Sequence, residues 1–364
     1  MDKQAQDFPR IGVLPSGPLD SICDVGEITV GHYTLADGPL QTGVTVLRPH
    51  AGDPYLDKVP AAATVLNGFG KSTGLVQVQE LGVLETPIAL TNTFGVGTVA
   101  NAQIRAACAA NPGIGRGLAT VNPLVFECND GYLNDIQALA VQESHYAGAL
   151  AAAGRQLQQG AVGAGRGMSC FSFKGGIGSA SRLASVQPDQ QYTIGALVLA
   201  NFGRLPNLTV AGRPFGRRLA QQLDRGLALA GENAAIVPEK GSIILLLATD
   251  APLDSRQLRR LSLRAGAGLA RTGSVFGHGS GDIALAFSTA YTVPQLPEQP
   301  MPALAMLHET RIDALFEAAA EACEQAIISA LWHADGVTGR DGNHRASIRD
   351  AAPQWRQWLS DTAF

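Results

Sequence analysis

The sequence has 364 residues, of which 46% are hydrophobic and 16% charged, and its formal net charge at pH 7 is −4. This composition is that of a folded globular protein with a sizeable core, so an intrinsically disordered chain is excluded. Because the chain has no extended basic cluster to hold a phosphate backbone, nucleic acid is not expected as a partner.

The opening stretch, MDKQAQDFPR, is polar and contains no apolar signal core. The longest aliphatic runs, such as IILLLA, fall far short of the roughly 20 residues that a membrane-spanning helix needs. We therefore expect a cytoplasmic protein that has no membrane partner. The cysteines Cys23, Cys108, Cys128, Cys170 and Cys323 are widely spaced and form no CxxC pair, so reduced and mostly buried thiols are expected.

Strand-like and helix-like runs are interspersed along the whole chain. The predicted strands are Gln41–Leu47, Ala61–Leu66, Ile88–Thr91, Gln191–Ala200, Ser242–Ala248 and Ile283–Ser288. The predicted helices, which are rich in alanine, are Thr98–Ala109, Asp135–Ala153, Asp254–Thr272 and Ile312–Trp332. This pattern predicts a layered α/β architecture in a single globule.

One long stretch, Gly203–Gly241, is the candidate linker. It contains prolines and glycines, a basic helix-like piece at Arg217–Leu229, and the loop GENAAIVPEKG directly before an apolar run. The run Ile243–Ala248 shows no polar alternation, which fits a strand buried on both faces. A loop in front of this strand would leave the peptide bond between Gly241 and Ser242 accessible to cleavage.

Several familiar motifs have weak support. A GxSxG pattern occurs at Gly70–Gly74, but the LVQVQELG that follows alternates like a strand, whereas a nucleophile elbow leads into a helix. The glycine-rich Gly95–Ala100 lacks the acidic residue about 20 positions later that a dinucleotide site needs. His278 in GHGSGD is held in reserve as a catalytic candidate, and Cys128 is expected to pack rather than react. Without HExxH or a Cys/His cluster, neither a metal nor a cofactor is expected.

A hydroxyl at the start of a buried strand, directly after glycine, has the chemistry needed for self-cleavage. Glycine allows a strained backbone, and the Ser242 hydroxyl can attack the carbonyl of Gly241 to form an ester that water opens. Ser242 then becomes a new N-terminus, whose α-amine has an unperturbed pKa of roughly 7.7–8.0. That amine can act as general base for its own hydroxyl without a histidine. The alternative is that Ser242 simply begins a strand.

Stretches along nearly the whole chain resemble one known family. They are RIGVLPSGPLDSICDVGEITVGHYTL (10–35), LETPIALTNTFGVGTV (84–99), VFECNDGYLND (125–135), GAGRGMSCFSFKGGIGSASR (163–182), LANFG (199–203), GSIILLLATDAPL (241–253), GHGSGDIALAFSTA (277–290) and VTGRDGN (337–343). The family is that of the self-processing serine aminopeptidases, which includes the L-aminopeptidase/D-alanine-esterase-amidase and the β-peptidyl aminopeptidases. The resemblance implies a four-layer αββα sandwich similar to the N-terminal-nucleophile hydrolases, with different strand connections.

The resemblance also implies how the chain matures. A single domain, residues 1–364, would be made as a precursor and cut between Gly241 and Ser242. The products would be an α chain (1–241) and a β chain (242–364), with Ser242 as the nucleophile.

Five further residues match functional positions of the family. Ser280 and Asp282 match the partners that orient the nucleophile and its amine, although some members carry glutamate at the position of Asp282. Asn201 matches the amide donor of the oxyanion hole, where a preorganised donor is worth about 3–4 kcal/mol. Glu127 matches the carboxylate that holds the free amino group of the substrate. Tyr132 matches a phenol beside the reacting carbonyl.

The predicted activity is that of an aminopeptidase that releases N-terminal residues from short peptides, amides or esters through an acyl-enzyme on Ser242. One alternative is an acyl transferase like the related ornithine acetyltransferases, although their nucleophile is typically threonine. The other is a non-catalytic relative that is never processed. The family suggests a homodimer or homotetramer, and a preference for L-, D- or β-residues is left open.

Overall fold

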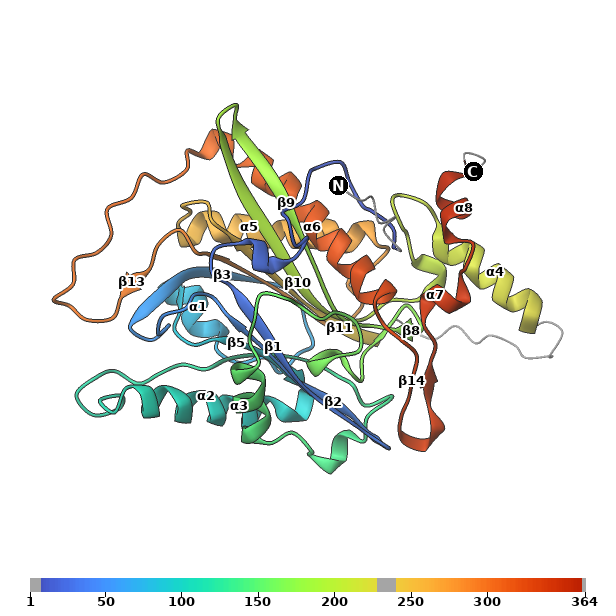
Figure 1. Cartoon of the computed structure of the whole chain (residues 1–364), viewed down its shortest axis with the longest axis horizontal. Coiled ribbons are helices and arrows are strands. Elements are labelled where there is room, and N and C mark those ends of the chain that lie inside the picture. Colours follow the sequence, from blue (N-terminus) through green and yellow to red (C-terminus); the bar gives the residue numbers. More distant parts are fainter. Residues whose placement is uncertain (1–7, 228–239, 362–364) are drawn as a thin grey trace.

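The fold is seen in a computed structural model that describes residues 8–227 and 240–361. Its two main sheets face each other (Figure 1). The smaller sheet has the order β1 (Thr29–Asp37), β2 (Leu40–Arg48), β5 (Ile88–Asn92) and β6 (Leu124–Cys128). The larger sheet has the order β13 (Val293–Pro294), β3 (Asp57–Gly68), β12 (Gly279–Ser288), β11 (Lys240–Thr249), β10 (Gln190–Asn201) and β9 (Gly176–Gln187), and β4 (Val83–Leu84) pairs with β3.

The remaining elements surround these sheets. Two short hairpins are formed by β7 (Ser169–Cys170) with β8 (Phe173–Lys174), and by β14 (Val337–Thr338) with β15 (His344–Arg345). The helices are α1 (Leu75–Leu81), α2 (Val96–Ala110), α3 (Glu143–Ala151), α4 (Phe215–Leu227), α5 (Ser255–Arg271), α6 (Asp313–Trp332), α7 (Ile348–Ala351) and α8 (Trp355–Ser360).

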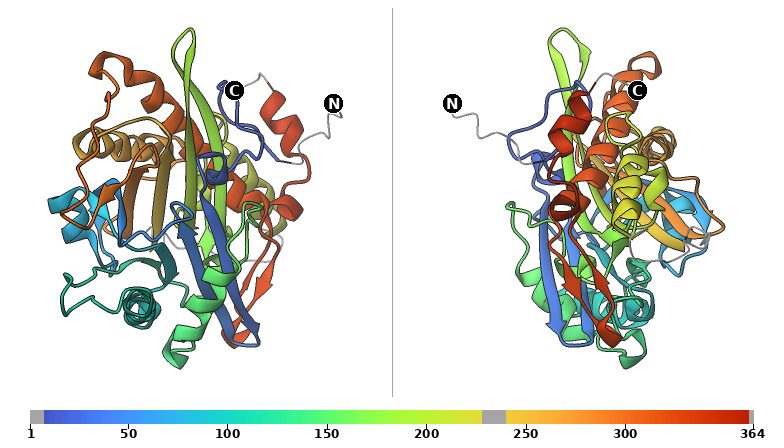
Figure 2. Two further views of the ribbon diagram at one scale, coloured as in Figure 1. Left: turned by 60° about the vertical axis from the view of Figure 1, so that its left-hand side comes forward. Right: turned by 90° about the vertical axis from the view of Figure 1, so that its right-hand side faces the viewer.

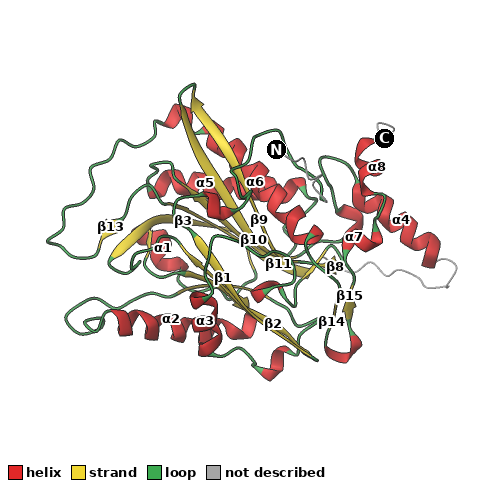
Figure 3. Cartoon of the chain, in the orientation of Figure 1, coloured by secondary structure: helices red, strands yellow, loops and turns green. Residues whose placement is uncertain are grey.

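The layers are held together by three apolar interfaces. Between the sheets, side chains such as Leu246 and Leu285 pack in one cluster with Leu90 and Phe126. Helices α2 and α3 cover the outer face of the smaller sheet, and α5 and α6 cover that of the larger sheet. The turned views in Figure 2 and the coloured elements in Figure 3 show the same arrangement. The predicted four-layer αββα sandwich is therefore confirmed.

Strand β11 is at the centre of the larger sheet. It runs antiparallel to β10 and parallel to β12. The side chains of Ile243–Ala248 are at most 1% exposed, so the absence of polar alternation correctly predicted a strand buried on both faces. The strand order also places β11 and β12 side by side between β3 and β10, which precede them in the sequence.

Most predicted elements are found with shifted ends, but two predictions in the first half are wrong. LVQVQELG, expected to alternate as a strand, forms helix α1, and left-handed glycines at Gly74 and Gly82 bound it at both ends. The helix expected over Asp135–Ala153 begins only at Glu143. Leu139 takes a left-handed conformation with φ of 48°, which interrupts the helix despite the good local propensity.

Three strands of five or more residues, β1, β6 and β9, were not predicted, and neither were the two-residue strands β4, β7, β8, β13, β14 and β15. In β9 the helix-facing side carries small residues because α6 lies very close, and a Cβ on Gly178 would come within 1.9 Å of the main-chain oxygen of Ala326. In the linker candidate, the basic piece expected at Arg217–Leu229 forms α4, which begins at Phe215. The rest of that linker up to residue 239 lies outside the described residues.

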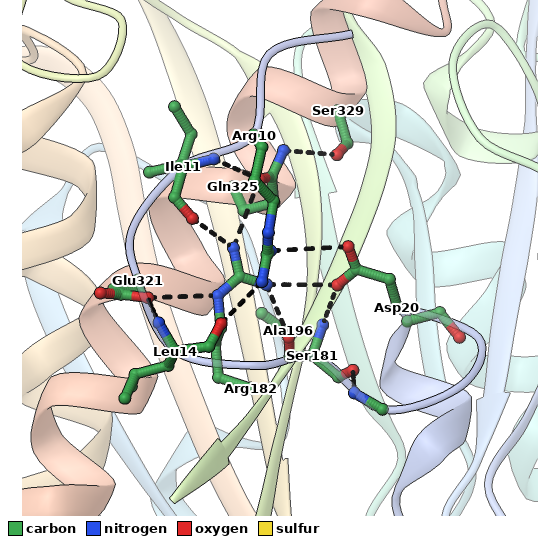
Figure 4. A network of polar contacts seen from close by, with 12 residues as sticks. Arg10, Ile11, Leu14, Asp20, Ser181, Arg182, Ala196, Glu321, Gln325 and Ser329 are labelled. Carbon is green, nitrogen blue, oxygen red and sulfur yellow. Dashed lines mark hydrogen bonds and ion pairs between the residues drawn. The ribbon is translucent and has the colours of Figure 1, made fainter. Parts of the chain in front are cut away.

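A buried arginine on β9 ties the N-terminal segment to α6 (Figure 4). Arg182 has no exposed surface, and its Nη1 lies 3.2 Å from Asp20 and its Nε 3.3 Å from Glu321. Its Nη2 donates to the main-chain oxygen of Ile11 at 2.7 Å and to Gln325 at 3.3 Å. Removing one partner of such a buried pair typically costs about 3–5 kcal/mol. The network therefore fixes the N-terminal segment, β9 and α6 relative to one another.

Across the described ranges, we find no helix with both the length and the apolar character needed to cross a membrane.

Candidate active site

A cavity of about 1140 Å³ opens at the end of the sheet interface where β10 ends and β11 begins. Its lining brings together four of the residues predicted from the sequence: Ser242, Asn201, Glu127 and Tyr132. Gly241 also lines it. Ser242, Asn201 and Glu127 are at most 7% exposed, whereas Tyr132 is 39% exposed and lies at the rim.

The position of Ser242 follows from strand register. It pairs with Asn201 on β10 and with Gly281 on β12. Its side chain falls on the same face of β11 as Ile244, which faces the smaller sheet. The main-chain N–H of Gly281 donates to Ser242 Oγ at 3.2 Å. The hydroxyl is thus held at the inner end of the cavity by a main-chain donor.

The residue before Ser242 has to be glycine. Gly241 has φ of 153°, and a Cβ there would come within 2.2 Å of the main-chain oxygen of Asn201. Gly281 is similarly constrained, because its Cβ would lie 2.7 Å from the main-chain oxygen of Phe69. Main-chain segments of three strands therefore converge closely around the bond between Gly241 and Ser242.

Asn201 is fixed through both ends of its side-chain amide. Its Oδ1 accepts from the main-chain N–H of Ser169 at 2.8 Å, and its Nδ2 donates to the main-chain oxygen of Asn129 at 2.9 Å. These contacts define which end of the amide is the donor. Asn201 and Ser242 are paired neighbours on one face of the sheet, and the Nδ2 amide has a second N–H besides the one that it donates to Asn129.

Ser280 and Asp282 do not line the cavity. They flank Gly281, the partner of Ser242, and Ser280 Oγ donates to Asp282 Oδ1 at 2.5 Å in a site where both are 1% exposed. Strand alternation places both side chains on the face of β12 that carries Ala284, opposite the Ser242 side chain. This pair therefore lies beside the main chain at Ser242 rather than beside its hydroxyl.

Glu127 is a buried carboxylate at the end of β6. Its Oε1 accepts from the main-chain N–H of Lys71 at 2.7 Å, and its Oε2 accepts from the hydroxyl of Thr93. None of the ion pairs among the described residues includes Glu127. A buried carboxylate held by two neutral donors, with lone pairs facing a cavity, is suited to bind a cation such as a substrate ammonium.

Tyr132 is held at the rim by Arg345, a residue that no sequence motif predicted. The guanidinium carbon of Arg345 lies 3.7 Å from the centre of the Tyr132 ring, and Arg345 Nε donates to Ser169 Oγ at 3.2 Å. Asn343 Nδ2 donates to the main-chain oxygen of Tyr132 at 2.9 Å. Arg345 comes just after the VTGRDGN stretch, and nothing in its local sequence distinguishes it from other surface arginines.

Two weakly supported motifs border the cavity through Lys71 and Gly279, but their candidate reactive side chains do not line it. Ser72 of the GxSxG pattern and His278 are not among the residues that line the cavity. The main-chain oxygen of His278 accepts from Asn67 Nδ2 at 3.2 Å, which anchors the turn before β12. Cys128 is buried, donates to the main-chain oxygen of Leu199 at 3.5 Å, and has its pKa raised well above the usual value by burial.

Comparison with known proteins gives consistent matches over most of the chain. The β-peptidyl aminopeptidase BapA of Sphingosinicella microcystinivorans is 39% identical over 341 residues, covering 90% of this chain and 84% of the relative. A solved β-aminopeptidase from Burkholderia sp. is 40% identical with a TM-score of 0.85, covering 95% of this chain and 97% of that chain. The L-aminopeptidase D-Ala-esterase/amidase of Ochrobactrum anthropi is 31% identical with a TM-score of 0.84, covering 97% and 98%.

The last of these structures is described as a new variant of the Ntn hydrolase fold and a prototype of the serine aminopeptidases. Residues 20–345 of this chain also match peptidase family S58. The family predicted from the sequence stretches is thereby confirmed. The match spans both sheets and every residue placed around the cavity, so the chain belongs to peptidase family S58 and is an aminopeptidase.

Proposed function

We propose that this aminopeptidase cuts itself between Gly241 and Ser242 and then uses Ser242 as an N-terminal nucleophile. The observation that carries the proposal is the pairing of Ser242 with Asn201 on one sheet face, in a cavity that also holds the buried Glu127. Nucleophile, oxyanion donor and ammonium site thus share one space. The mature protein would consist of residues 1–241 and 242–364.

Self-cleavage would proceed by transfer of an acyl group from nitrogen to oxygen. The Ser242 hydroxyl attacks the carbonyl carbon of Gly241, the C–N bond breaks, and the nitrogen leaves as an amine after taking up a proton. That amine is the new α-amine of Ser242. Water then hydrolyses the ester, which releases the Gly241 carboxylate and restores the Ser242 hydroxyl. The crowded backbone at Gly241 supports this step, since only glycine fits there.

Substrate turnover would repeat the same chemistry on another carbonyl. The Ser242 α-amine takes the proton of its own hydroxyl, the oxygen attacks the first carbonyl of the substrate, and Asn201 Nδ2 donates to the developing oxyanion. The leaving amine receives the proton, and water later releases the acyl group. The Ser280–Asp282 pair would orient the Ser242 α-amine from beside the main chain.

We propose short peptides, amides and esters with a free amino group as the substrates. Two relatives at 39% and 40% identity are named for β-peptides or β-amino acids, so we include N-terminal β-residues among the candidates. We further propose that the mature protein acts in the cytoplasm as a homodimer or homotetramer, which light scattering on the purified protein would test.

The assignment of Glu127 predicts that the free amino group of the substrate is required. N-acetylation of a good substrate should abolish turnover, because the ammonium that Glu127 binds is lost. Glu127→Gln should lower kcat/KM about 10- to 100-fold by weakening binding, since a hydrogen bond to a charged group is worth about 1.5–3 kcal/mol. Glu143→Gln, at a half-buried residue paired with Arg105 away from the cavity, is the matched control. Equal rates on blocked and free substrates would remove Glu127 from the site.

The proposed base predicts a specific change in pH dependence. The Ser242 α-amine must be neutral to accept a proton, so kcat/KM should rise with pH through the pKa of that amine. A nearby carboxylate favours the ammonium and raises this pKa, so Asp282→Asn should lower it and move the rising limb toward acid. If the limb stays in place in Asp282→Asn but disappears in His278→Ala, the base is the histidine.

A further inference from the structure

The described lining of the cavity carries more basic than acidic side chains. Its described lining includes three basic residues, Lys71, Arg204 and Arg345, and one acidic residue, Glu127. None of these four takes part in any ion pair between described residues. A site that binds only the ammonium of a substrate would need the carboxylate alone. The excess of positive charge therefore points to a second charged group on the substrate, and that group must be an anion.

Lys71 Nζ lies 4.4 Å from the centre of the Phe69 ring, but Arg345 has both a ring contact and a side-chain hydrogen bond to its charged group. The Tyr132 ring lies against the face of its guanidinium at 3.7 Å, and its Nε is engaged by Ser169 Oγ at 3.2 Å. Its side chain is half-buried, and burial lowers the pKa of the guanidinium from its usual value. No acidic partner of Arg345 is found within residues 8–227 and 240–361, and a partly desolvated cation of this kind is costly for the free protein. That cost is offset when an anion of suitable shape binds.

The position of Arg345 relative to the reacting groups tells which part of a substrate it meets. It contacts Ser169, whose main-chain N–H holds the side chain of Asn201, so it lies next to the oxyanion donor. Glu127 has Lys71 and Thr93 as its hydrogen-bond partners and shares none with Arg345. Glu127 comes from β6 of the smaller sheet and Arg345 from the β14–β15 hairpin, so the two charges are supplied by different elements. A substrate whose ammonium is on Glu127 would extend its leaving group toward Arg345.

We propose that Arg345 binds the C-terminal carboxylate of a short peptide, so that the natural substrates of this aminopeptidase are dipeptides and similarly short zwitterionic peptides. The inference rests on the proposed function, since it requires the ammonium to lie on Glu127. Arginine is suited to the task because its planar fork can bind both oxygens of a carboxylate, which a lysine ammonium cannot match. Arg345 is then a specificity-determining residue.

The test compares two substrates that differ only in this carboxylate. Let X be whichever of L-alanine, D-alanine or β-alanine the wild-type protein releases fastest from its p-nitroanilide. The measured quantity is the ratio of kcat/KM for X-Gly to that for X-Gly-NH2. We expect a ratio of at least about 10 in the wild type, as a charge-assisted bidentate contact provides. Arg345→Gln should bring the ratio to about 1, and Arg345→Lys should give an intermediate value.

Two controls identify the arginine responsible. Arg349→Gln, at an exposed residue whose partner is Asp335, should keep the wild-type ratio. Arg204→Gln changes another cation of the same cavity and should also keep most of it. If the ratio instead falls in Arg204→Gln and persists in Arg345→Gln, the carboxylate site belongs to Arg204 and the proposal is wrong.

Three further results would contradict recognition of the substrate carboxylate by Arg345 or the function on which it rests. A wild-type ratio near 1 overturns the proposal even if every variant fails to fold. An equal loss on both substrates in Arg345→Gln, with the ratio unchanged, would mean that Arg345 only positions Asn201 through Ser169, and it overturns carboxylate recognition. If the wild-type protein cleaves none of the p-nitroanilides, the proposed function itself has failed, which is a distinct result.

Discussion

Ser242→Ala should be recovered as one uncut chain with essentially no aminopeptidase activity. Without the hydroxyl, nothing attacks the carbonyl of Gly241, and no nucleophile is available to a substrate. Loss of the nucleophile typically lowers kcat by at least about 10⁴-fold, and activity should fall by this order. The variant should still fold, because the side chain lost is small and only the N–H of Gly281 loses its acceptor. Intact-mass analysis and a denaturing gel would distinguish one chain from two.

Matched variants separate this mechanism from its rivals. Ser242→Cys retains a nucleophile and should still cut itself, at a changed rate. Ser72→Ala removes the hydroxyl of the GxSxG pattern, which does not line the cavity, and should be cut and active like the wild type. A Ser242→Ala protein that still splits at the same bond would disprove self-cleavage by this hydroxyl. A wild-type protein that stays intact and inactive would instead be a non-catalytic relative.

Asn201 should carry the second largest effect. Loss of a single side-chain donor from an oxyanion hole typically lowers kcat by about 10²–10³-fold, and we expect a decrease of this size for Asn201→Ala with little change in KM. Asn201→Asp is the second variant: it keeps an oxygen to accept from the main-chain N–H of Ser169, and it loses the Nδ2 donor together with its hydrogen bond to the main-chain oxygen of Asn129. Both variants should be impaired if donation from Nδ2 is the function.

The extent of self-cleavage between Gly241 and Ser242 has to be measured for each Asn201 variant together with its activity. The same donor would also assist self-cleavage, so activity should be expressed per mole of the 242–364 chain. Asn122→Ala, at an exposed asparagine that contacts Glu85 away from the cavity, is the control for a simple loss of an amide. If Asn201→Asp retains full kcat once it is cut, another group must stabilise the oxyanion.

The sequence predicted central elements better than those shaped by their neighbours. Strand β11 was predicted because a short apolar run without polar residues is typical of a strand buried on both faces. Strand β9 was missed because its contact with α6 requires small residues such as Gly178 and Ala180, so the apolar signal is absent. The N-terminus of α3 was predicted eight residues too early, at Asp135 instead of Glu143, for a different reason. Alanine and leucine favour a helix there, and tertiary contacts override that preference at Leu139.

In the candidate site, too, the residues with a local sequence pattern were predicted more readily than those brought together by tertiary contacts. Glycine, serine and an apolar run at 241–248 are compatible with self-cleavage, but taken alone they fit an ordinary start of a strand better, and only the family resemblance favoured self-cleavage. The proposed roles of Asn201 and Glu127 came only from the resemblance. Asn201 meets Ser242 through the pairing of β10 with β11, and Glu127 lines the same cavity from β6 of the other sheet, so no local pattern links either residue to the serine. Arg345 was not predicted at all. Its importance depends on an aromatic ring and a serine that come from two other segments, and no local pattern records such a convergence.

The interleaved order of the larger sheet has a consequence for how the mature protein would behave after denaturation. Strands β11 and β12 lie between β3 and β10. Cutting before Ser242 would therefore leave two strands of the 242–364 chain inserted between strands of the 1–241 chain. The uncut chain can refold by itself at a rate independent of concentration. The cut protein, once unfolded, must refold by an encounter of two separate chains, which is a second-order reaction whose rate falls on dilution. Maturation would thus make unfolding effectively one-way at low concentration, and the persistence of the active form would be set by its unfolding rate.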